Sequence, residues 1–283
     1  MSNQINNVLV VEGGALRSVF SAGLLDGFLD NTFNPFDCYI GVSAGASNLI
    51  TYMSETPGKS INAILNLALK KEFISYSRFL FGGHLIDLDW LFKTIFSENH
   101  LDLDKVYRHG KSLYVCTTDV NTGKAVYTNT NMENLVPVIK ASTALPVLYR
   151  GFPTVNGHPM TDGGVADGIP VSEALRIGGK RIMVIRSRPK NYIKQDTLGH
   201  KYIRWKLRKY PLLTKKMRAR VKIHSEAIGI IRNPPPGVEI MEVCPPESFN
   251  IGRFSRNRIN LLQGYEAGFT LAHDTINRWT SMS

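Results

Sequence analysis

Short runs of apolar residues alternate along this chain with stretches in which apolar residues recur every three or four positions. The runs predict β-strands, and the helical spacing predicts α-helices. The predicted strands are residues 8–11, 36–40, 112–118, 124–128, 181–185 and 238–243. The predicted helices start near residues 19 and 46 and span residues 60–71, 88–96, 132–141 and 171–177. This alternation predicts a layered α/β sheet, and a hairpin-like turn at residues 121–123 predicts that the sheet is mixed.

The segment Gly41-Val42-Ser43-Ala44-Gly45 lies between a predicted strand and a predicted helix. A G-x-S-x-G motif in that context is typical of a nucleophile elbow, whose sharp turn exposes the serine hydroxyl. Gly41 and Gly45 lack a Cβ atom, so they allow the strand and the helix to approach closely. Gly and Ser are also the usual residues of plain turns, so the motif alone leaves that interpretation open.

A second glycine turn, Gly13-Gly14-Ala15, follows the first predicted strand. Consecutive backbone N–H groups in such a turn can stabilise an oxyanion, and loss of one such donor raises an activation barrier by about 3 kcal/mol or more. Arg17 adds a permanent positive charge beside the turn. A simple strand-to-helix turn with a solvated arginine explains the same residues, and the spacing differs from the dinucleotide motif G-x-G-x-x-G.

Asp162 comes directly before Gly163 and Gly164. Glycines can adopt positive φ angles, so such a turn can direct the aspartate carboxylate away from the chain. Asp-Gly is also a common signal of an ordinary turn. Taken alone, Asp162 fits that ordinary turn, and so does Asp167.

These three segments together resemble the patatin-like phospholipase family. That family combines a glycine-rich oxyanion loop with a following Arg or Lys, a G-x-S-x-G serine, and an aspartate in a D-G-G or D-G-A turn. The resemblance includes residues 141–146 and 169–171, and it covers about residues 7–189, which we expect to form the catalytic domain. It implies a three-layer α/β/α fold with a mixed central sheet and a nucleophile elbow after an early strand.

The resemblance also implies the roles of individual residues. Ser43 corresponds to the nucleophile and Asp162 to its partner, in a dyad that uses no histidine in the catalytic step. The backbone N–H groups of Gly13, Gly14 and Ala15 correspond to the oxyanion hole, with Arg17 beside it.

The chain departs from the family pattern at Ala15 and Ser18, where the family usually carries glycine. The N–H donors remain, but a positive φ at Ala15 would strain the backbone by ~1 kcal/mol. We therefore expect these two residues to affect the rate more than the fold. A free aspartate, with a pKa of about 3.9, is a poor base at neutral pH. Burial of Asp162 beside an apolar acyl pocket would raise that pKa.

Composition sets outer limits on the function. With 283 residues, 43% of them hydrophobic and 20% charged, the chain fits one large globular domain, or one domain with a small appendage. Residues 1–7 lack the pattern of a secretion signal, and no apolar run approaches the roughly 18 residues of a membrane span. The three scattered cysteines and the seven histidines lack the spacing of disulfide frameworks or metal sites. We expect a cytoplasmic protein without metal or cofactor.

Positive charge is concentrated in residues 190–232, which contain 13 Lys and Arg residues against two acidic ones, in a chain of net charge +11. Basic residues there are interleaved with Tyr202, Trp205 and Leu207, a combination that suits an anionic membrane surface. A solvated helical face explains the same pattern. No nucleic-acid recognition module is recognisable, so nucleic acid is a poor candidate partner. We expect residues 190–283 to pack on or extend the catalytic domain.

We interpret the chain as a serine hydrolase of lipid acyl esters, a phospholipase of the A type that works through an acyl-serine intermediate. One alternative is an α/β-hydrolase-type esterase with a triad of Ser43, Asp162 and either His224 or His273. The early position of Ser43 in the chain argues against that triad. Another alternative is a catalytically impaired module that binds lipid or protein, which the departures at Ala15 and Ser18 leave open.

Overall fold

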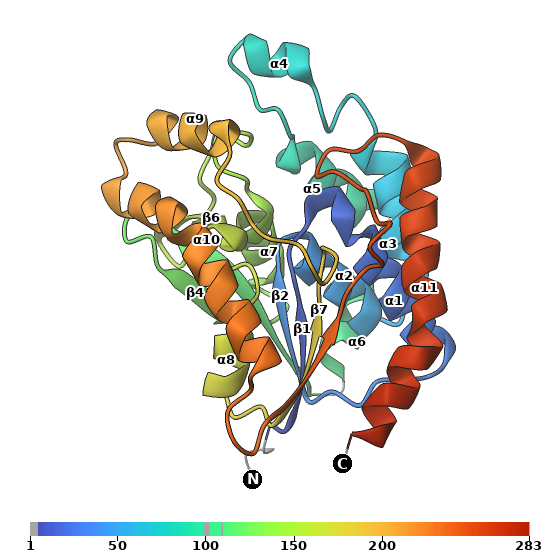
Figure 1. Cartoon of the computed structure of the whole chain (residues 1–283). Coiled ribbons are helices and arrows are strands. Elements are labelled where there is room, and N and C mark those ends of the chain that lie inside the picture. The colour runs from blue at the N-terminus through green and yellow to red at the C-terminus, as the bar shows by residue number, and fades with distance from the viewer. Residues whose placement is uncertain (1–4, 99–101, 109, 283) are drawn as a thin grey trace.

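The computed structural model describes residues 5–98, 102–108 and 110–282 (Figure 1). Residues 1–4 of the polar N-terminal stretch therefore lie outside the described residues. An eight-stranded sheet forms the centre, with the strand order β5-β6-β3-β2-β1-β7-β8 and with β4 paired to β3. The strands are β1 (Asn7–Val11), β2 (Cys38–Val42), β3 (Ser112–Asp119), β4 (Ala125–Asn129), β5 (Thr154–Val155), β6 (His158–Asp162), β7 (Arg181–Ile185) and β8 (Glu239–Val243).

The sheet is mixed, as the sequence predicts. Strands β2, β1, β7 and β8 run parallel, and β3 runs parallel to β2. Strand β4 returns antiparallel to β3 through the predicted hairpin, and β6 also pairs antiparallel with β3. Because β6 pairs with β3 at its carboxyl end, Thr117 lies opposite Asp162. This pairing carries Asp162 to the edge of the sheet at which the parallel strands end.

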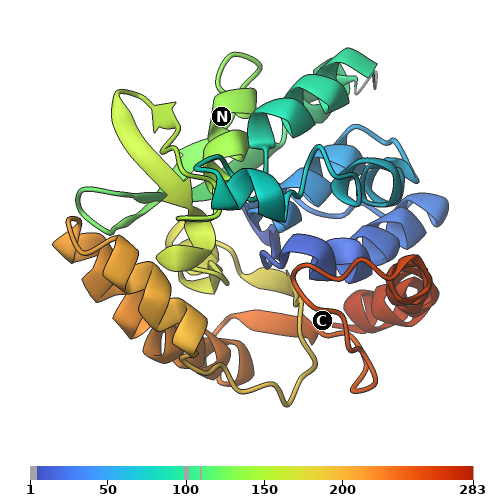
Figure 2. The same ribbon diagram turned by 90° about the horizontal axis from the view of Figure 1, so that it is seen from above.

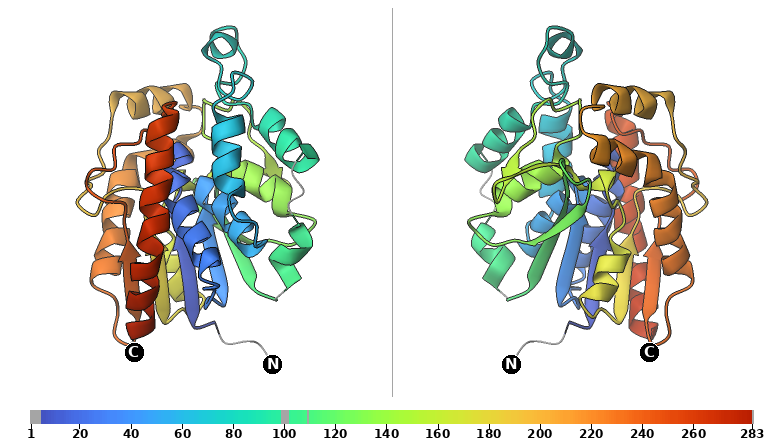
Figure 3. Two further views of the ribbon diagram at one scale, coloured as in Figure 1. Left: turned by 90° about the vertical axis from the view of Figure 1, so that its right-hand side faces the viewer. Right: turned by 90° about the vertical axis from the view of Figure 1, so that its left-hand side faces the viewer.

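Helices cover both faces of the sheet, which makes three layers (Figure 2). One face carries α1 (Val19–Asp30), α2 (Ala44–Met53), α3 (Lys59–Ala63), α5 (Leu88–Glu98), α6 (Leu103–Arg108), α7 (Leu135–Thr143) and α11 (Arg258–Ser281). The other face carries α8 (Val171–Arg176) and α10 (Pro211–Arg232). Two short helices, α4 (Tyr76–Leu80) and α9 (Leu198–Lys206), lie at one end of the molecule (Figure 3).

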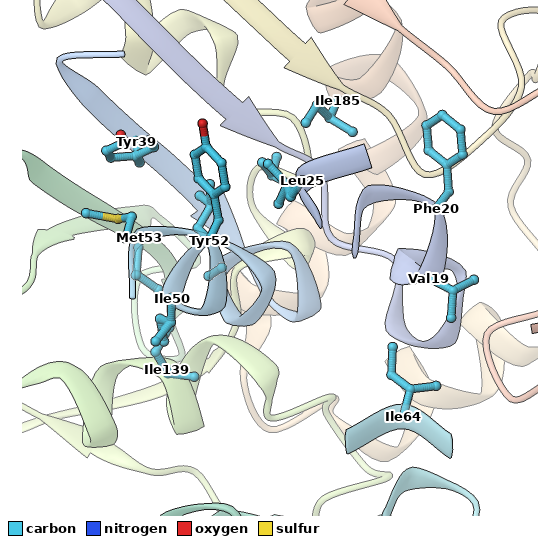
Figure 4. Packing of buried hydrophobic residues seen from close by; sticks show 14 of the residues in the cluster. Val19, Phe20, Leu25, Tyr39, Ile50, Tyr52, Met53, Ile64, Ile139 and Ile185 are labelled. Atoms are coloured by element: carbon cyan, nitrogen blue, oxygen red, sulfur yellow. The ribbon is translucent and has the colours of Figure 1, made fainter. Parts of the chain in front are cut away.

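The central strands are buried on both faces, because alternate residues enter different cores. In β1, Leu9 and Val11 belong to the core under α1 and α2, whereas Val8 and Val10 belong to the core under α8 and α10. Figure 4 shows the first of these cores. A strand that is buried on both faces has a nearly continuous run of apolar residues, and such a run is easy to recognise in the sequence. The strands predicted at residues 112–118, 124–128, 181–185 and 238–243 correspond to β3, β4, β7 and β8.

The C-terminal part of the chain is integrated into this fold. Strand β8 pairs with β7 at one edge of the sheet, and α11 packs along α1. The two helices approach so closely that a Cβ atom at Gly268 would lie 2.1 Å from the carbonyl oxygen of Phe20. One at Gly23 would lie 1.9 Å from the carbonyl oxygen of Tyr265. The division of the chain into parts at residue 190 stays a prediction.

The helix predicted at residues 60–71 changes its geometry along its length. It begins as α3, continues without a break after Ala63 as a π-helical turn, η2 (Ile64–Ala68), and ends at Ala68. The wider π-turn brings both Ile64 and Leu65 into the core. Such turns are frequent beside functional sites, and Ile64 lines a cavity described below. Among the helices of the described residues, none has the length and apolar character needed to cross a bilayer.

Candidate active site

Ser43 lies on the sharp turn between β2 and α2. Its backbone has φ 53° and ψ −129°, a strained conformation for a residue other than glycine. The two flanking glycines make the turn possible: a Cβ atom at Gly41 would lie 2.4 Å from Cα of Ala46, and one at Gly45 would lie 2.6 Å from the carbonyl oxygen of Val11. The turn thus has the geometry of a nucleophile elbow.

Ser142 on α7 holds this turn from behind. The Ser43 N–H donates to the Ser142 hydroxyl oxygen at 2.8 Å, and that hydroxyl donates to the carbonyl oxygen of Cys116 at 2.7 Å. Ser142 is fully buried, so water cannot replace these bonds. The sequence offers no signal for this role beyond the place of Ser142 in the stretch 141–146 that resembles the family.

Asp162 ends β6 beside Ser43. Its Oδ1 atom accepts a hydrogen bond from the Gly164 N–H at 2.8 Å. This hydrogen bond closes the turn that the Asp-Gly-Gly sequence predicts. Asp162 as a whole is 4% exposed. Burial raises the pKa of Asp162, although hydrogen bonds from the Ser43 side chain and from Gly164 oppose that shift. The structure therefore joins the predicted nucleophile to a buried carboxylate with raised basicity.

The glycine turn after β1 faces the same point. A Cβ atom at Gly13 would lie 3.2 Å from the Cβ atom of Ser43, so only a glycine leaves room beside the nucleophile. Within the described part of the chain, the N–H groups of Gly13, Gly14 and Ala15 donate no hydrogen bond to the protein. These donors are therefore free to receive a substrate oxygen. Ala15 has φ 51°, the positive value at which a side chain causes strain.

Ser18 and Arg17 follow this turn in the chain and lie close to it in the structure. The Ser18 hydroxyl donates to the carbonyl oxygen of Ala15 at 2.7 Å, so the two departures from the family pattern contact each other. Arg17 is 5% exposed, and its Nη2 atom lies 3.5 Å from the Ser187 hydroxyl oxygen. Burial, together with the neighbouring charges of Arg253 and Arg188, lowers the pKa of Arg17 to about 9.

A buried ion pair supports the turn from the adjacent strand. Glu12 accepts hydrogen bonds from the Ser187 N–H at 2.7 Å and from Nε of Arg186 at 3.1 Å. Burial alone would raise the pKa of Glu12, but Arg186 and the Ser187 N–H outweigh it, and the pKa is lowered. Arg186 also pairs with Glu242 of β8. The pattern of the sequence does not identify this network, because Glu12, Arg186 and Glu242 lie on or directly after three strands that are more than 50 residues apart along the chain.

Of the two histidines of the alternative triad, His224 lines a polar cavity together with Ser43 and Asp162, and His273 lies on α11. His224 on α10 is buried beside Arg186, with 3.4 Å between Nε2 and the Nη2 atom of the arginine. Burial and Lys194 lower the pKa of His224 to about 4. His273 is exposed on α11 and contacts Asn277. Among the described residues, neither histidine hydrogen-bonds to Asp162, so the geometry lends the triad no support.

Ser43 lies where two cavities of different character meet. The apolar cavity, of about 190 Å³, is enclosed by side chains of α2, η2, α5 and α7. Its walls include Leu16, Ile50, Ile64, Leu88, Phe92 and Ile139. The polar cavity, of about 60 Å³, contains Asp162 and the glycine turn. Both are lined by Ser43, Ala15, Leu145 and Arg253. An ester bond at Ser43 would thus have an apolar group on one side and a polar group on the other.

Known proteins resemble this chain in sequence and in structure. A family model described as patatin-like phospholipase matches residues 9–175, and one described as a domain of unknown function (DUF6363) matches residues 210–282. The uncharacterized protein YjjU of Escherichia coli K12 is 36% identical over 244 residues, which are 84% of this chain and 68% of YjjU. The crystal structure of VipD from Legionella pneumophila has a TM-score of 0.47 at 14% identity, over 97% of this chain and 67% of VipD.

The chain belongs to the patatin-like phospholipase family. This membership places it in general terms among the hydrolases of lipid acyl esters. The family match spans the elbow, the glycine turn and the Asp-Gly-Gly turn, which the structure brings to one point.

Proposed function

We propose that the protein is a phospholipase of the A type in which Ser43 and Asp162 form the catalytic dyad. The observation that carries this proposal is the meeting, in one polar cavity, of the elbow serine with a buried carboxylate whose pKa is raised by burial. A serine hydroxyl needs such a base, because it is a weak nucleophile by itself. A carboxylate with a raised pKa accepts a proton more readily than an exposed one does.

The first half of the reaction acylates the serine. Asp162 takes the hydroxyl proton while Oγ of Ser43 attacks the ester carbonyl carbon, and the carbonyl oxygen becomes an oxyanion. The free N–H groups of Gly13, Gly14 and Ala15 line the same polar cavity as Ser43 and receive this charge. The C–O bond of the ester then breaks, and the departing alcohol takes the proton from Asp162. The acyl chain remains on Ser43, in the apolar cavity.

The second half releases the fatty acid. Asp162 is ionised again and takes a proton from a water molecule that attacks the acyl-serine carbonyl carbon. The same N–H groups stabilise the second oxyanion. Its collapse breaks the bond to Oγ, which regains its proton from Asp162. One carboxylate thus serves both halves, and no histidine takes part.

We further propose that the protein reaches its substrate at an anionic membrane surface. Helix α9 exposes Leu198 and Trp205, which are 80% and 55% exposed, and the Nζ atom of Lys206 lies 5.0 Å from the Trp205 ring centre. Helix α4 and the next residue expose Leu80 and Phe81, which are 82% and 91% exposed. Both helices lie at the end of the molecule toward which the parallel strands run (Figures 1 and 3). Apolar tips beside basic residues suit such a surface.

Hydrolysis of p-nitrophenyl esters of increasing acyl length tests the proposed chemistry. Wild-type protein should hydrolyse them with a kcat/KM that rises with acyl length until the apolar cavity is filled. Ser43→Ala should abolish the reaction, whereas Ser225→Ala, an exposed serine on α10, serves as the matched control. Unchanged hydrolysis by a folded Ser43→Ala variant would refute the proposal.

A further inference from the structure

The polar cavity beside Ser43 is walled by five basic side chains from four separate segments. They are Arg17 of η1 (Ala15–Ser18), Arg188 and Lys194 of the chain between β7 and α9, Arg220 of α10, and Arg253 of the chain between β8 and α11. Among the described residues, two carboxylates, those of Glu12 and Asp162, line the same cavity. Glu12 is already bound by Arg186, so the cavity carries a large excess of positive charge.

These cations lack the carboxylate partners that buried charges normally have. Arg17 is buried, and the other four are half-buried. Within the described residues, none of the five forms an ion pair; Arg220 donates to the carbonyl oxygen of Gly164 at 3.2 Å, and the Arg188 guanidinium lies 4.6 Å from the centre of the Tyr192 ring. Arg17 is 5% exposed, and its buried Nε and Nη1 atoms have no hydrogen-bond partner there. The buried Nε of Arg188 has none either. Buried charges are usually paired, so these groups point to an anion that is not part of the protein.

Mutual repulsion among the basic groups helps to lower the pKa values of two of them, Lys194 and Arg220. Burial and the charges of Arg220 and Arg253 lower the pKa of Lys194 to about 7. Burial and Arg253 lower the pKa of Arg220 to about 10. A bound anion would reverse both shifts, because it would favour the charged forms.

We propose that this cavity binds the phosphate of an acyl glycerophosphate, with the ester carbonyl at Ser43 and the acyl chain in the apolar cavity. This inference rests on the proposed function and names the substrate class. Arginine side chains match phosphate oxygens in charge and geometry. A cavity of about 60 Å³ has room for a phosphate group, since roughly 10–15 Å³ suffices for one water.

The charge of the cavity also selects among head groups. A head group that ends at the phosphate brings only negative charge into contact with the five cations. A choline head group would add a quaternary ammonium ion to the same small cavity, where it would be repelled. Lysophosphatidic acid should therefore be a better substrate than lysophosphatidylcholine or monoacylglycerol with the same acyl chain.

The test compares kcat/KM for lysophosphatidic acid with that for the matched monoacylglycerol. Wild-type protein should prefer the phosphate ester, and this preference should fall by about tenfold or more in Arg188→Gln and in Lys194→Gln, since each loses one charged contact to phosphate. Arg218→Gln, an exposed arginine two residues before Arg220, removes the same charge outside the cavity and should leave the preference unchanged. Equal preference in all four proteins would overturn the inference.

A second arm separates a lipid head group from free phosphate and needs no variant. Inorganic phosphate and glycerol 3-phosphate should inhibit hydrolysis of the monoacylglycerol competitively, and the glycerol ester should be the stronger inhibitor. Tight binding of inorganic phosphate without a preference for lysophosphatidic acid would make the cavity a site for the free ion and overturn the inference. If the wild type hydrolyses no ester but binds glycerol 3-phosphate in calorimetry, the proposed function fails while the anion site stands.

Discussion

Ala15 and Ser18 are the residues at which this chain departs from its family, and they form one local unit. The Ser18 hydroxyl donates to the carbonyl oxygen of Ala15, whose φ is 51°. This hydrogen bond fixes the carbonyl group of the residue that has the positive φ angle. The two departures from the family pattern are therefore coupled through one contact.

Ala15→Gly should preserve or raise kcat, because the N–H donor remains and the strain of positive φ is relieved. Ser18→Gly should lower kcat in the wild type and lower it less in the Ala15→Gly background. A double-mutant cycle on kcat, with unfolding temperatures measured in parallel, checks this coupling. A tenfold loss of kcat in Ala15→Gly at unchanged stability would show that the methyl group is an adaptation and contradict this account.

Asp162 should make the folded protein less stable at neutral pH than an amide would. Its pKa is raised in the folded state above the unfolded value of about 3.9, so the folded state keeps this proton to higher pH. The contribution to the free energy of unfolding therefore falls as the pH rises from about 4 through the raised pKa. Asp162→Asn removes this loss and can still accept the Gly164 N–H.

The expected result is a gain in unfolding temperature for Asp162→Asn that is smallest near pH 4 and grows toward neutral pH. Its kcat should fall by orders of magnitude, because base and nucleophile act as a unit. Thermal unfolding between pH 4 and pH 8 and ester hydrolysis measure the two effects. A variant less stable than the wild type at pH 7 would contradict the burial argument. An equal loss of kcat in His224→Ala would favour the triad.

At the scale of elements, the basic part of the chain performs two separate tasks in this account. Lys194 and Arg220 line the polar cavity, whereas Lys201 and Lys206 of α9 and Lys215 of α10 are exposed. The prediction from charge alone treats residues 190–232 as one surface, because composition does not distinguish the faces of a helix. The structure assigns the segment both to the site and to the exterior.

Replacement of the outward basic residues by Gln should weaken co-sedimentation with liposomes that contain phosphatidylglycerol. The positions are Lys206, Arg208, Lys209 and Lys215, which are all exposed. Each should contribute ~1 kcal/mol near an anionic leaflet, and salt should reduce this part. Leu80→Ser together with Phe81→Ser should reduce the part that survives salt. Equal binding of the wild type to neutral and anionic liposomes would contradict this role and show that α9 and α10 form an ordinary solvated surface.

The sequence predicts best those elements whose structure depends on residues close together in the chain. The buried strands are short apolar runs between polar turns, and the hairpin at residues 121–123 has a glycine at φ 67°. Within the predicted helix of residues 60–71, the part formed by η2 has π-helical geometry, because apolar residues on several sides suit a π-turn as well as an α-helix. Ser142 and the Glu12–Arg186 pair escaped prediction, because distant segments meet only in the folded sheet.

At the scale of the whole molecule, the active site depends on nearly the full length of the chain. The nucleophile and the glycine turn come from the first 45 residues, and Asp162 comes from the middle. Arg220 and Arg253 come from the C-terminal part, which the sheet edge β8 and the close packing of α11 on α1 hold in place. Apolar and cationic cavities that meet at one serine match an amphipathic substrate, with its acyl chain and its phosphate on opposite sides of the ester.

The most direct test of the central claim is covalent labelling with a fluorophosphonate, followed by mass spectrometry to locate the adduct. A fluorophosphonate reacts only with an activated serine, so the test needs no knowledge of the natural substrate. The account predicts one adduct, on Ser43, that is absent in Ser43→Ala and strongly slowed in Asp162→Asn. An adduct on another serine, or undiminished labelling of Ser43→Ala, would contradict it.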